Sequence, residues 1–321
     1  MNYKREKTSI PKHISYHLKR WNSNILKSND NKASETISVN LDNTTIQNQN
    51  SIIETKDTNF IFSAGFKELD KISSTWLTDD VIVLGGRPGM GKTAFIQSII
   101  PHLAFDLQKP IVIFSLEMSA LLYLNRLISH VSQIPTSKLR SGMLNDEEIY
   151  LLDECVSKLK DTPIYLDDTV GISIADLKEK CCKLKKGKNI QLIVIDYCQL
   201  MKTEANYDNR LLEISSIYKG LKELAMEIKT PIITLAQLSR APEMRSDKRP
   251  IISDLIPDRA FHLYVDRIMF LYRPDYYGLS DRNDENLKSQ DAEIIIAKNK
   301  NGKLGMVPIK FDSTNAHFED L

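Results

Sequence analysis

The chain has 321 residues, of which 42% are hydrophobic and 26% charged, with a formal net charge of +1; this balance is typical of a globular protein with one large or two small domains. A chain this neutral is not a globally basic nucleic-acid binder, so any basic surface must be local. It has no apolar run near the ~18 residues that span a bilayer, no signal-peptide core, and no metal or disulfide spacing among Cys155, Cys181, Cys182 and Cys198, which predicts a cytoplasmic protein without membrane contact.

The first 58 residues differ in composition from the rest of the chain. Apolar residues recur there at helical spacing, at Ile14, Leu18, Trp21 and Ile25. Lysines and arginines surround them, which predicts a basic amphipathic helix within residues 1–27. Residues 28–58 are rich in Ser, Thr, Asn and Asp and predict a flexible linker, because they bury too little apolar surface to offset their ordering entropy. A lone short helix is marginal in water, so we expect it to dock on its own domain or on a neighbouring subunit.

From residue 59 onward, buried apolar runs alternate with stretches of helical spacing. The apolar runs predict strands at 80–86, 110–116, 163–168, 191–197, 231–237 and 266–272. Helical spacing marks residues 92–105, 147–160, 174–186 and 214–228. Near-continuous apolar strands separated by helices predict one α/β domain over residues 59–321, with a mostly parallel central sheet flanked by helices.

The end of this domain predicts an antiparallel hairpin. Its arms are the β-prone runs 292–296 and 306–311, and Asn301-Gly302 lies between them. This dipeptide is the strongest short-range hairpin signal, because the favoured two-residue turn needs positive φ at both positions. Lys298 and Lys300 lie one residue apart on one arm and therefore on the same face. A solvated edge strand protected by charge would explain them.

Residues 86–93, GRPGMGKT, fit the phosphate-binding pattern G-x-x-x-x-G-K-[ST] in full. The motif follows an apolar strand and opens a helix, which is the context that its mechanism requires. Glycines let backbone N–H groups curl round a phosphate, Lys92 reaches the β and γ oxygens, and Thr93 offers a hydroxyl to Mg²⁺. The sequence therefore predicts binding of ATP with Mg²⁺ by Gly86, Arg87, Pro88, Gly89, Met90, Gly91, Lys92 and Thr93.

Three polar residues lie where other predicted strands end. Asp196 ends one strand, where a buried carboxylate is costly unless Mg²⁺ offsets the cost; a turn-capping Asp is the alternative. Glu117 could orient an attacking water, or simply head a surface helix. Gln237 could contact a γ-phosphate through its amide, although a lone Gln is a weak signal. Open α/β sheets bind ligands at the carboxyl ends of their strands, so we expect all three beside the loop.

Several motifs resemble those of DnaB-type replicative helicases, in the same order along residues 60–321. They are GFKELDKI, GGRPGMGKTAF, FSLEMS, IVIDYCQLM, LKELAMEIKTPIITLAQLSR, RPIISDL, FLYRPDYY and AEIIIAKNKNG. The resemblance implies a RecA-like P-loop ATPase domain in which Glu117 is the catalytic carboxylate, Asp196 the Mg²⁺-shell acid and Gln237 the γ-phosphate sensor. It also implies, more weakly, that Arg240 contributes to the nucleotide site.

The same resemblance carries expectations about assembly. It implies a ring, expected to be a homo-hexamer, with nucleotide at each subunit interface and single-stranded DNA in the central hole. A helicase loader or primase is a further expected partner. In the family the C-terminal hairpin supplies residues in trans to the neighbour's γ-phosphate, a catalytic role that Lys298 and Lys300 would take here. Lys300 stands where an arginine is expected, and this exchange is not conservative. The charged-edge interpretation stays open.

The sequence also departs from the family. Residues 1–58 do not match its helical N-terminal domain, and residues 256–266 have Ile256, Arg259 and His262 where the family has arginine, glycine and glutamate. Two functions therefore stay open. The first is a ring helicase that translocates on single-stranded DNA in replication. The second is a divergent assembly or regulatory subunit that binds ATP without unwinding DNA. The motifs make a RadA- or KaiC-like ATPase a weaker third hypothesis.

Overall fold

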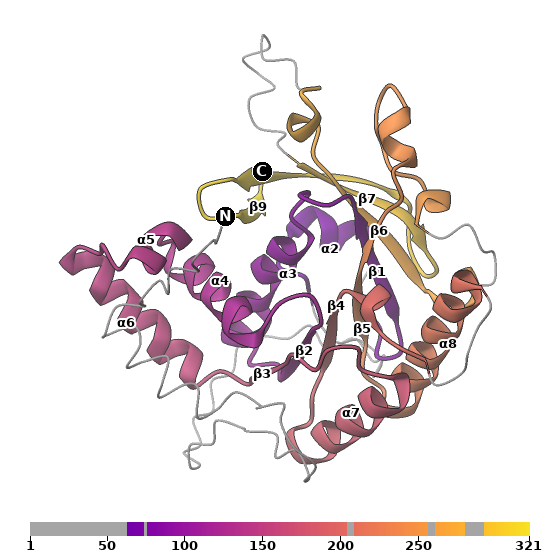
Figure 1. Cartoon of the computed structure of the whole chain (residues 1–321), viewed down its shortest axis with the longest axis horizontal. Helices are drawn as coiled ribbons and strands as arrows, with labels where there is room; N and C mark the ends of the chain where they lie inside the picture. Colours follow the sequence, from indigo (N-terminus) through magenta and orange to yellow (C-terminus); the bar gives the residue numbers. More distant parts are fainter. Residues whose placement is uncertain (1–62, 74–75, 204–208, 256–260, 280–291) are drawn as a thin grey trace, which may run out of the picture.

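A computed structural model describes residues 63–73, 76–203, 209–255, 261–279 and 292–321. The predicted helix within 1–27, the predicted linker 28–58, Ile256 and Arg259 lie outside the described residues. The described chain is built on a nine-stranded sheet in the order β3-β2-β4-β5-β1-β6-β7-β8-β9, with helices on both faces (Figure 1). This confirms the predicted α/β class.

Six parallel strands form the first two thirds of the sheet. They are β1 (Val81–Gly86), β2 (Ile111–Ser115), β3 (Ile164–Asp167), β4 (Leu192–Asp196), β5 (Ile232–Gln237) and β6 (Arg267–Tyr272). Each coincides with a predicted apolar run. β1 is central and buried on both faces, because successive side chains point to opposite sides of a strand. Ile82 and Leu84 join one core and Val81 and Val83 the other.

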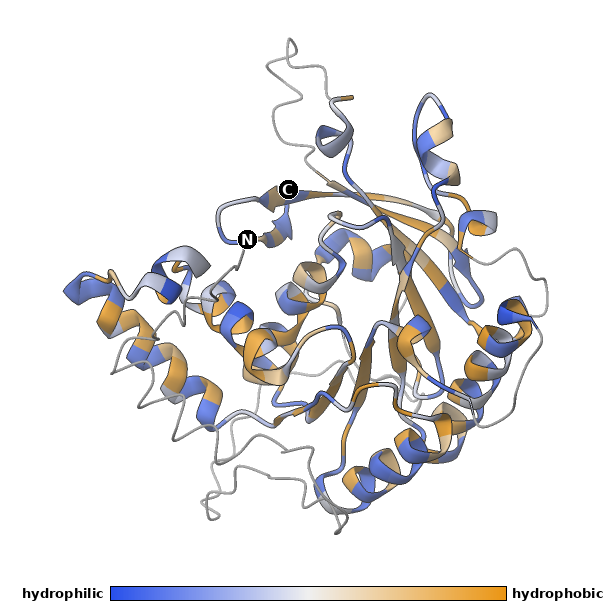
Figure 2. Cartoon of the chain, viewed as in Figure 1, coloured by the Kyte–Doolittle hydropathy of each residue, from blue (hydrophilic) through white to orange (hydrophobic). Residues whose placement is uncertain are grey.

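The helices form a layer on each face of the sheet (Figure 1). One core contains side chains of α2 (Lys67–Ser73), α3 (Lys92–Pro101), α4 (Ala120–Ser132), α5 (Thr136–Ser141) and α6 (Asp146–Lys160). The other contains side chains of α7 (Ile174–Lys188), α8 (Arg210–Ile228) and α9 (Phe261–Tyr264). Figure 2 shows β1, β4 and β5 as almost uniformly hydrophobic, whereas α7 and α8 are amphipathic. The strands are continuous apolar runs in the sequence because helices cover both faces of the sheet.

Polar caps fix where several helices begin. The Ser119 side chain accepts a hydrogen bond from the Leu122 N–H at the start of α4, and Ser173 accepts one from the Asp176 N–H at the start of α7. Asn145 and Glu148 form a reciprocal capping box at the start of α6. Such caps satisfy backbone donors that have no partner inside the helix. Helix α4 was not among the helices predicted from the sequence.

Short helical segments complete the described chain. They are a π-helix η1 (His102–Asp106), which continues α3, and 3₁₀ turns η2 (Cys198–Leu200), η3 (Ala241–Met244), η4 (Ile252–Asp254) and η5 (Asp275–Tyr277). Among the described residues, no helix combines the length and apolarity needed to cross a membrane. All four cysteines are free thiols. Burial raises the pKa of Cys155 to about 12 and that of Cys198 to about 11, so both stay protonated at neutral pH.

The C-terminal strands are antiparallel: β7 (Ala292–Asn299), β8 (Gly305–Asp312) and β9 (His317–Asp320). The predicted arms are confirmed, but the predicted tight Asn301-Gly302 turn is wrong. The β7–β8 ladder stops at the Ile296–Gly305 pair, and neither turn residue adopts positive φ.

Tertiary pairing overrides the local turn signal. Beyond Ile296, β7 leaves β8 and continues along β6, where Lys298 pairs with Ile268. The Lys300 N–H then donates to the Asp266 carbonyl at 3.0 Å. Backbone groups that a two-residue turn would have used therefore pair with β6 and with the residue just before it, Asp266.

Candidate nucleotide-binding site

A cleft of about 850 Å³ lies where the parallel strands end. Of the residues expected at the site, those that line it are Pro88, Gly89, Gly91, Lys92, Thr93, Glu117, Asp196 and Gln237. They come from the loop after β1, the segment after β2 and the last residues of β4 and β5. Because these strands are parallel, their carboxyl ends meet at one edge of the sheet. The chain thus gathers in one cleft expected residues that are distant in sequence, from Pro88 to Gln237.

The phosphate-binding loop owes its path to two glycines with positive φ. Gly89 has φ +81° and Gly91 has φ +96°, in the region that other residues rarely adopt. Gly91 immediately precedes α3, so the loop ends at the helix N-terminus. A Cβ atom at position 89 would lie 2.7 Å from the Tyr276 hydroxyl oxygen, so a larger residue there would require the Tyr276 side chain to move. The cradle formed by this loop fits a phosphate group.

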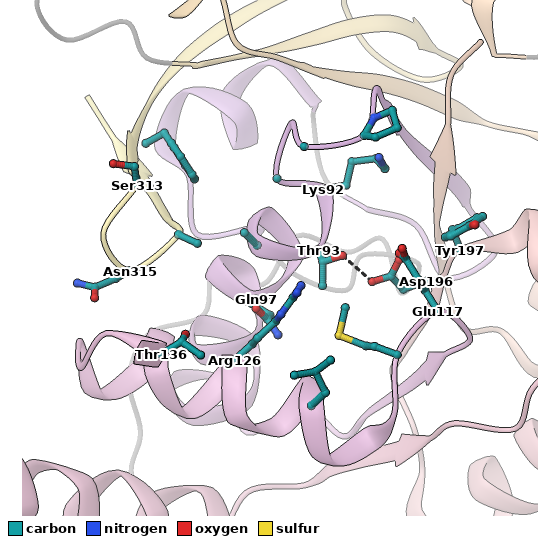
Figure 3. A pocket seen from close by; sticks show the side chains of 18 of the residues that line it. Lys92, Thr93, Gln97, Glu117, Arg126, Thr136, Asp196, Tyr197, Ser313 and Asn315 are labelled. Atoms are coloured by element: carbon teal, nitrogen blue, oxygen red, sulfur yellow. Dashed lines mark hydrogen bonds between the residues drawn. The ribbon is translucent and has the colours of Figure 1, made fainter. Parts of the chain in front are cut away.

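Lys92 is held over the loop by backbone oxygens. Its Nζ donates to the Gly86 carbonyl at 2.9 Å and to the Arg87 carbonyl at 3.3 Å. Burial lowers the pKa of the Lys92 ammonium, while the carboxylates of Asp196 and Glu117 act in the opposite direction. Figure 3 shows the side chain at the edge of the cleft between the loop and the acidic residues. An ammonium in this position is suited to neutralise phosphate oxygens.

Thr93 and Asp196 meet at the base of the cleft (Figure 3). The Thr93 hydroxyl donates to Asp196 Oδ2 at 2.7 Å, although the two residues come from α3 and β4. Only 3% of Asp196 is exposed, and burial raises the pKa of its carboxyl to about 6. The Thr93 hydrogen bond opposes this shift, whereas the nearby Glu117 adds to it. A costly carboxylate beside a hydroxyl is a donor set that fits Mg²⁺.

Glu117 is tied to the same place through the backbone. The N–H groups of Leu116 and Glu117 donate to the Asp196 carbonyl oxygen at 2.7 and 3.3 Å. These bonds extend the pairing between β2 and β4, whose last pair is Ser115 with Asp196. They fix the Glu117 main chain beside Asp196 while its side chain lines the cleft (Figure 3). A carboxylate held here can orient a water molecule toward a phosphate bound on the loop.

Other predicted residues lie near the cleft without lining it. The Arg87 side chain turns away: its Nη1 donates to the Leu238 carbonyl at 2.9 Å, and its Nε donates to Glu243 at 2.8 Å. Gly86 and Met90 do not line the cleft, and Met90 is buried in the core. Arg240 is exposed and also does not line it. The loop therefore presents only some of its eight residues to a ligand.

Lys298 and Lys300 lie near the amino end of β6, whereas the cleft of their own chain lies at the carboxyl ends of the parallel strands. Lys298 Nζ donates to the carbonyl oxygens of His262 and Val265, both at 2.5 Å. Lys300 is 64% exposed, and its Nζ lies 3.5 Å from Asp266 Oδ1. Burial lowers the pKa of the Lys298 ammonium. The two lysines thus differ: Lys298 is engaged within its own chain and Lys300 points mostly to solvent.

Several cleft residues had no signal in the sequence reasoning. Arg126 on α4 and Arg140 on α5 line the cleft, as do Tyr197 and Asn315. Figure 3 shows Arg126 reaching from α4 toward Thr93. A single arginine on an amphipathic helix carries no motif, so only the placement of α4 could have revealed it. Phe311 also lines the cleft, and the Arg273 guanidinium lies 3.8 Å from the centre of its ring.

The parallel sheet and the glycine loop between β1 and α3 define a P-loop nucleotide-binding protein with a RecA-like fold. Comparison with known proteins narrows this class. Residues 62–320 match the family described as the DnaB-like helicase C terminal domain, and the chain belongs to that family. The family predicted from the sequence motifs is thereby confirmed.

Individual relatives agree with this assignment. The chain is 40% identical to replicative DNA helicase DnaB of Geobacillus stearothermophilus and 39% identical to replicative DNA helicase DnaC of Bacillus subtilis, each over 258 residues that cover 80% of this chain. Those residues cover 56% of each relative, so the chain spans little more than half the length of the curated relatives it matches.

Two solved structures share the fold. One is an ATPase domain, which matches with a TM-score of 0.75 and 32% identity, covering 83% of this chain and 93% of that one. The other is a DnaB-like replicative helicase, solved in a study of its interactions with primase, which matches with a TM-score of 0.75 and 31% identity, covering 83% of this chain and 64% of that one.

Proposed function

We propose that this chain hydrolyses ATP with Mg²⁺ and uses the energy to move along single-stranded DNA during replication, as a ring of identical subunits, with a hexamer as the expected size. The observation that carries the proposal is the Thr93–Asp196 pair beside Lys92 and Glu117, which places in one cleft the groups proposed to act within a single chain. The replicative helicases among its relatives support the DNA-related part of the proposal.

Each residue of the cleft would have its own task. The glycine loop and Lys92 bind the phosphates, and Glu117 orients the attacking water and holds its proton. The Gln237 amide contacts the γ-phosphate. Thr93 and Asp196 would hold Mg²⁺, which supplies charge neutralisation at the phosphate oxygens. Arg240, which does not line the cleft of its own chain, stays a weaker proposal for nucleotide contact.

The C-terminal lysines would act on a neighbouring subunit. Lys300 is the better candidate for the trans role, because its side chain is exposed and, among the described residues, makes a long contact to Asp266. Lys298 would support it by holding the segment before β6. A primase as partner is supported by the relative that was studied with primase, and a helicase loader stays part of the proposal. A cytoplasmic location is part of the proposal, and the free thiols are compatible with it.

The second hypothesis, a regulatory subunit that binds ATP without unwinding DNA, rests on the altered sequence at 256–266. Turnover assays separate the two. We expect ATP hydrolysis by the purified full chain to rise on addition of single-stranded oligonucleotide, and a Lys92→Ala variant to lose it. Binding of the oligonucleotide should weaken steeply with salt, because phosphate contacts release counterions. ATP binding without DNA stimulation would instead favour the regulatory subunit.

A further inference from the structure

Gln199 makes an unusual pair of contacts with the backbone of Gln237. Its side-chain Nε2 donates to the Gln237 carbonyl at 3.1 Å, and its Oε1 accepts the Gln237 N–H at 3.4 Å. Only this orientation of the amide gives both backbone groups a complementary partner. The side chain therefore contacts the main chain of Gln237 in the way that a neighbouring strand would.

The sheet itself leaves this position unsupported on one side. β5 pairs with β4 only as far as Thr234 with Ile195, so Gln237 lies three residues beyond the last pair. On its other side β5 stays paired with β1 as far as Gln237 with Gly86, the first residue of the phosphate-binding loop. Gln199 thus fills the place that β4 vacates.

Gln199 is itself held firmly relative to Asp196. It belongs to the 3₁₀ turn Cys198–Leu200, which begins two residues after Asp196. Beneath the turn, the Cys198 thiol lies 2.9 Å from the Tyr218 hydroxyl, which lies 3.1 Å from the Thr234 hydroxyl on β5. Above it, Arg210 Nη2 donates to the Gln199 carbonyl at 2.6 Å. The turn is therefore anchored to both α8 and β5.

We infer that Gln199 is a positioning residue. It fixes the main chain of Gln237 relative to Asp196 and so sets the contact of the Gln237 side-chain amide with the γ-phosphate. The inference rests on the proposed ATP binding and on the sensing role proposed for Gln237. Gln199 acts through hydrogen bonds to the Gln237 backbone and does not itself line the cleft. Misplacing a group by about 1 Å can reduce a rate by about a hundredfold, so this support matters.

The first test is steady-state kinetics on the full chain with Gln199→Glu and Gln199→Ala. Glutamate has the same size but places an oxygen opposite the Gln237 carbonyl, which repels it. We expect kcat to fall by about tenfold or more, with the inhibition constant of ADP within about twofold of wild type, because the phosphate-binding loop is untouched. Gln108→Glu is the matched control, since the Gln108 amide also donates to a backbone carbonyl, that of Phe105 at 2.9 Å. It should behave as wild type.

A double variant separates positioning from general stability. If Gln199 acts only through Gln237, Gln199→Ala combined with Gln237→Ala should be no slower than Gln237→Ala alone. Losses that multiply, or a change in the inhibition constant of ADP rather than in kcat, would overturn the inference.

A binding measurement decides the inference even if turnover is absent. The wild type should bind a non-hydrolysable ATP analogue, AMP-PNP, more tightly than ADP, and Gln199→Glu should lose this preference while keeping its affinity for ADP. A preference unchanged in Gln199→Glu, or missing in the wild type, would overturn it. Absent turnover with an intact wild-type preference that Gln199→Glu abolishes would reject the proposed hydrolysis and retain the inference.

Discussion

The two ends of the parallel sheet both bury charged side chains, and their surroundings differ. At the amino end, Asp266 accepts the Val81 N–H at 2.9 Å and Lys222 Nζ at 2.8 Å, and Asp80 pairs with Arg267 at 3.1 Å. At the carboxyl end, Asp196 has one hydroxyl donor, and no side-chain cation in the described part of the chain forms an ion pair with it.

This difference separates a structural charge from a functional one. A buried carboxylate that is given several donors holds elements together, as Asp266 does for β1, β6 and α8. The pKa of about 6 for Asp196 indicates that the burial of its carboxylate is poorly compensated. A cation bound beside such a carboxylate would stabilise its charged form. Lys298 and Lys300 lie at the amino end of the parallel strands in their own chain, whereas their proposed function is at the nucleotide site of the neighbouring subunit.

The largest effect is expected from removing the Lys300 side chain, which tests whether this lysine has a functional rather than a structural task. If it acts on a neighbour's phosphate, Lys300→Ala should lower ATP turnover by about a thousandfold, the scale of a finger residue. The melting temperature should hardly change, because the Lys300–Asp266 contact is exposed and long.

Mixing two inactive variants tests whether the effect crosses between chains. A mixture of Lys300→Ala and Lys92→Ala subunits creates some interfaces with both lysines intact, so turnover should partly return. If Lys300 merely protects an edge strand, neither the loss nor the recovery will be seen.

The next largest effect is expected from Asp196→Asn, which should slow turnover by about 100-fold to 1,000-fold. The same change should stabilise the nucleotide-free protein. A pKa raised from 3.8 to about 6 corresponds to a cost on the order of 3 kcal/mol at neutral pH, which the neutral amide avoids. Thermal unfolding checks this, with exposed Asp153→Asn as the control. A lower melting temperature for Asp196→Asn would show that the Asp196 charge is already compensated.

The pH dependence should distinguish activity from stability at this residue. Below pH about 6 the Asp196 carboxyl of the nucleotide-free protein gains a proton, so kcat/KM for ATP should fall by up to about tenfold for each pH unit. Stability should move the other way. Because the folded-state pKa is raised, the contribution of Asp196 is fully present below pH 3.8 and is lost as the pH rises through about 6. The gap in melting temperature between wild type and Asp196→Asn should therefore be smaller at pH 5 than at pH 7.5.

The smallest effect concerns Lys298. Lys298→Met should lower the free energy of unfolding by about 1–3 kcal/mol, because the carbonyls of His262 and Val265 would lose a charged donor. Lys300→Met should cost under about 1 kcal/mol, since its pair is exposed. Denaturant unfolding of both variants makes the comparison. Equal losses would mean that the two lysines do not have separate tasks.

Much of the architecture was predictable because it rests on local patterns. The strands β1, β4 and β5 are continuous apolar runs that only a sheet covered on both faces can bury, and the loop from Gly86 to Thr93 carries its own motif. The order of strands brings Asp196 and Gln237 beside that loop, and their place at strand ends was enough to expect it.

What could not be predicted depends on contacts distant in sequence. The Asn301-Gly302 turn failed because β6 competes for the same backbone groups. Arg126 lines the cleft only because α4 packs against α3, and the contact of Gln199 with Gln237 appears only where β4 stops short of β5. The assignment of residues 1–27, 28–58 and 59–321 as separate segments stays a prediction, as do the roles in trans.

β6 pairs with β1 on one side and with β7 on the other. β1 runs directly into the phosphate-binding loop, and β7 ends at the lysines proposed to reach the next subunit. Ladder hydrogen bonds resist sliding, because a one-residue slip would turn every buried side chain to the other face. The three strands therefore form one hydrogen-bonded unit. If the lysines do reach the next subunit, one continuous ladder would join the nucleotide site of one subunit to that of its neighbour.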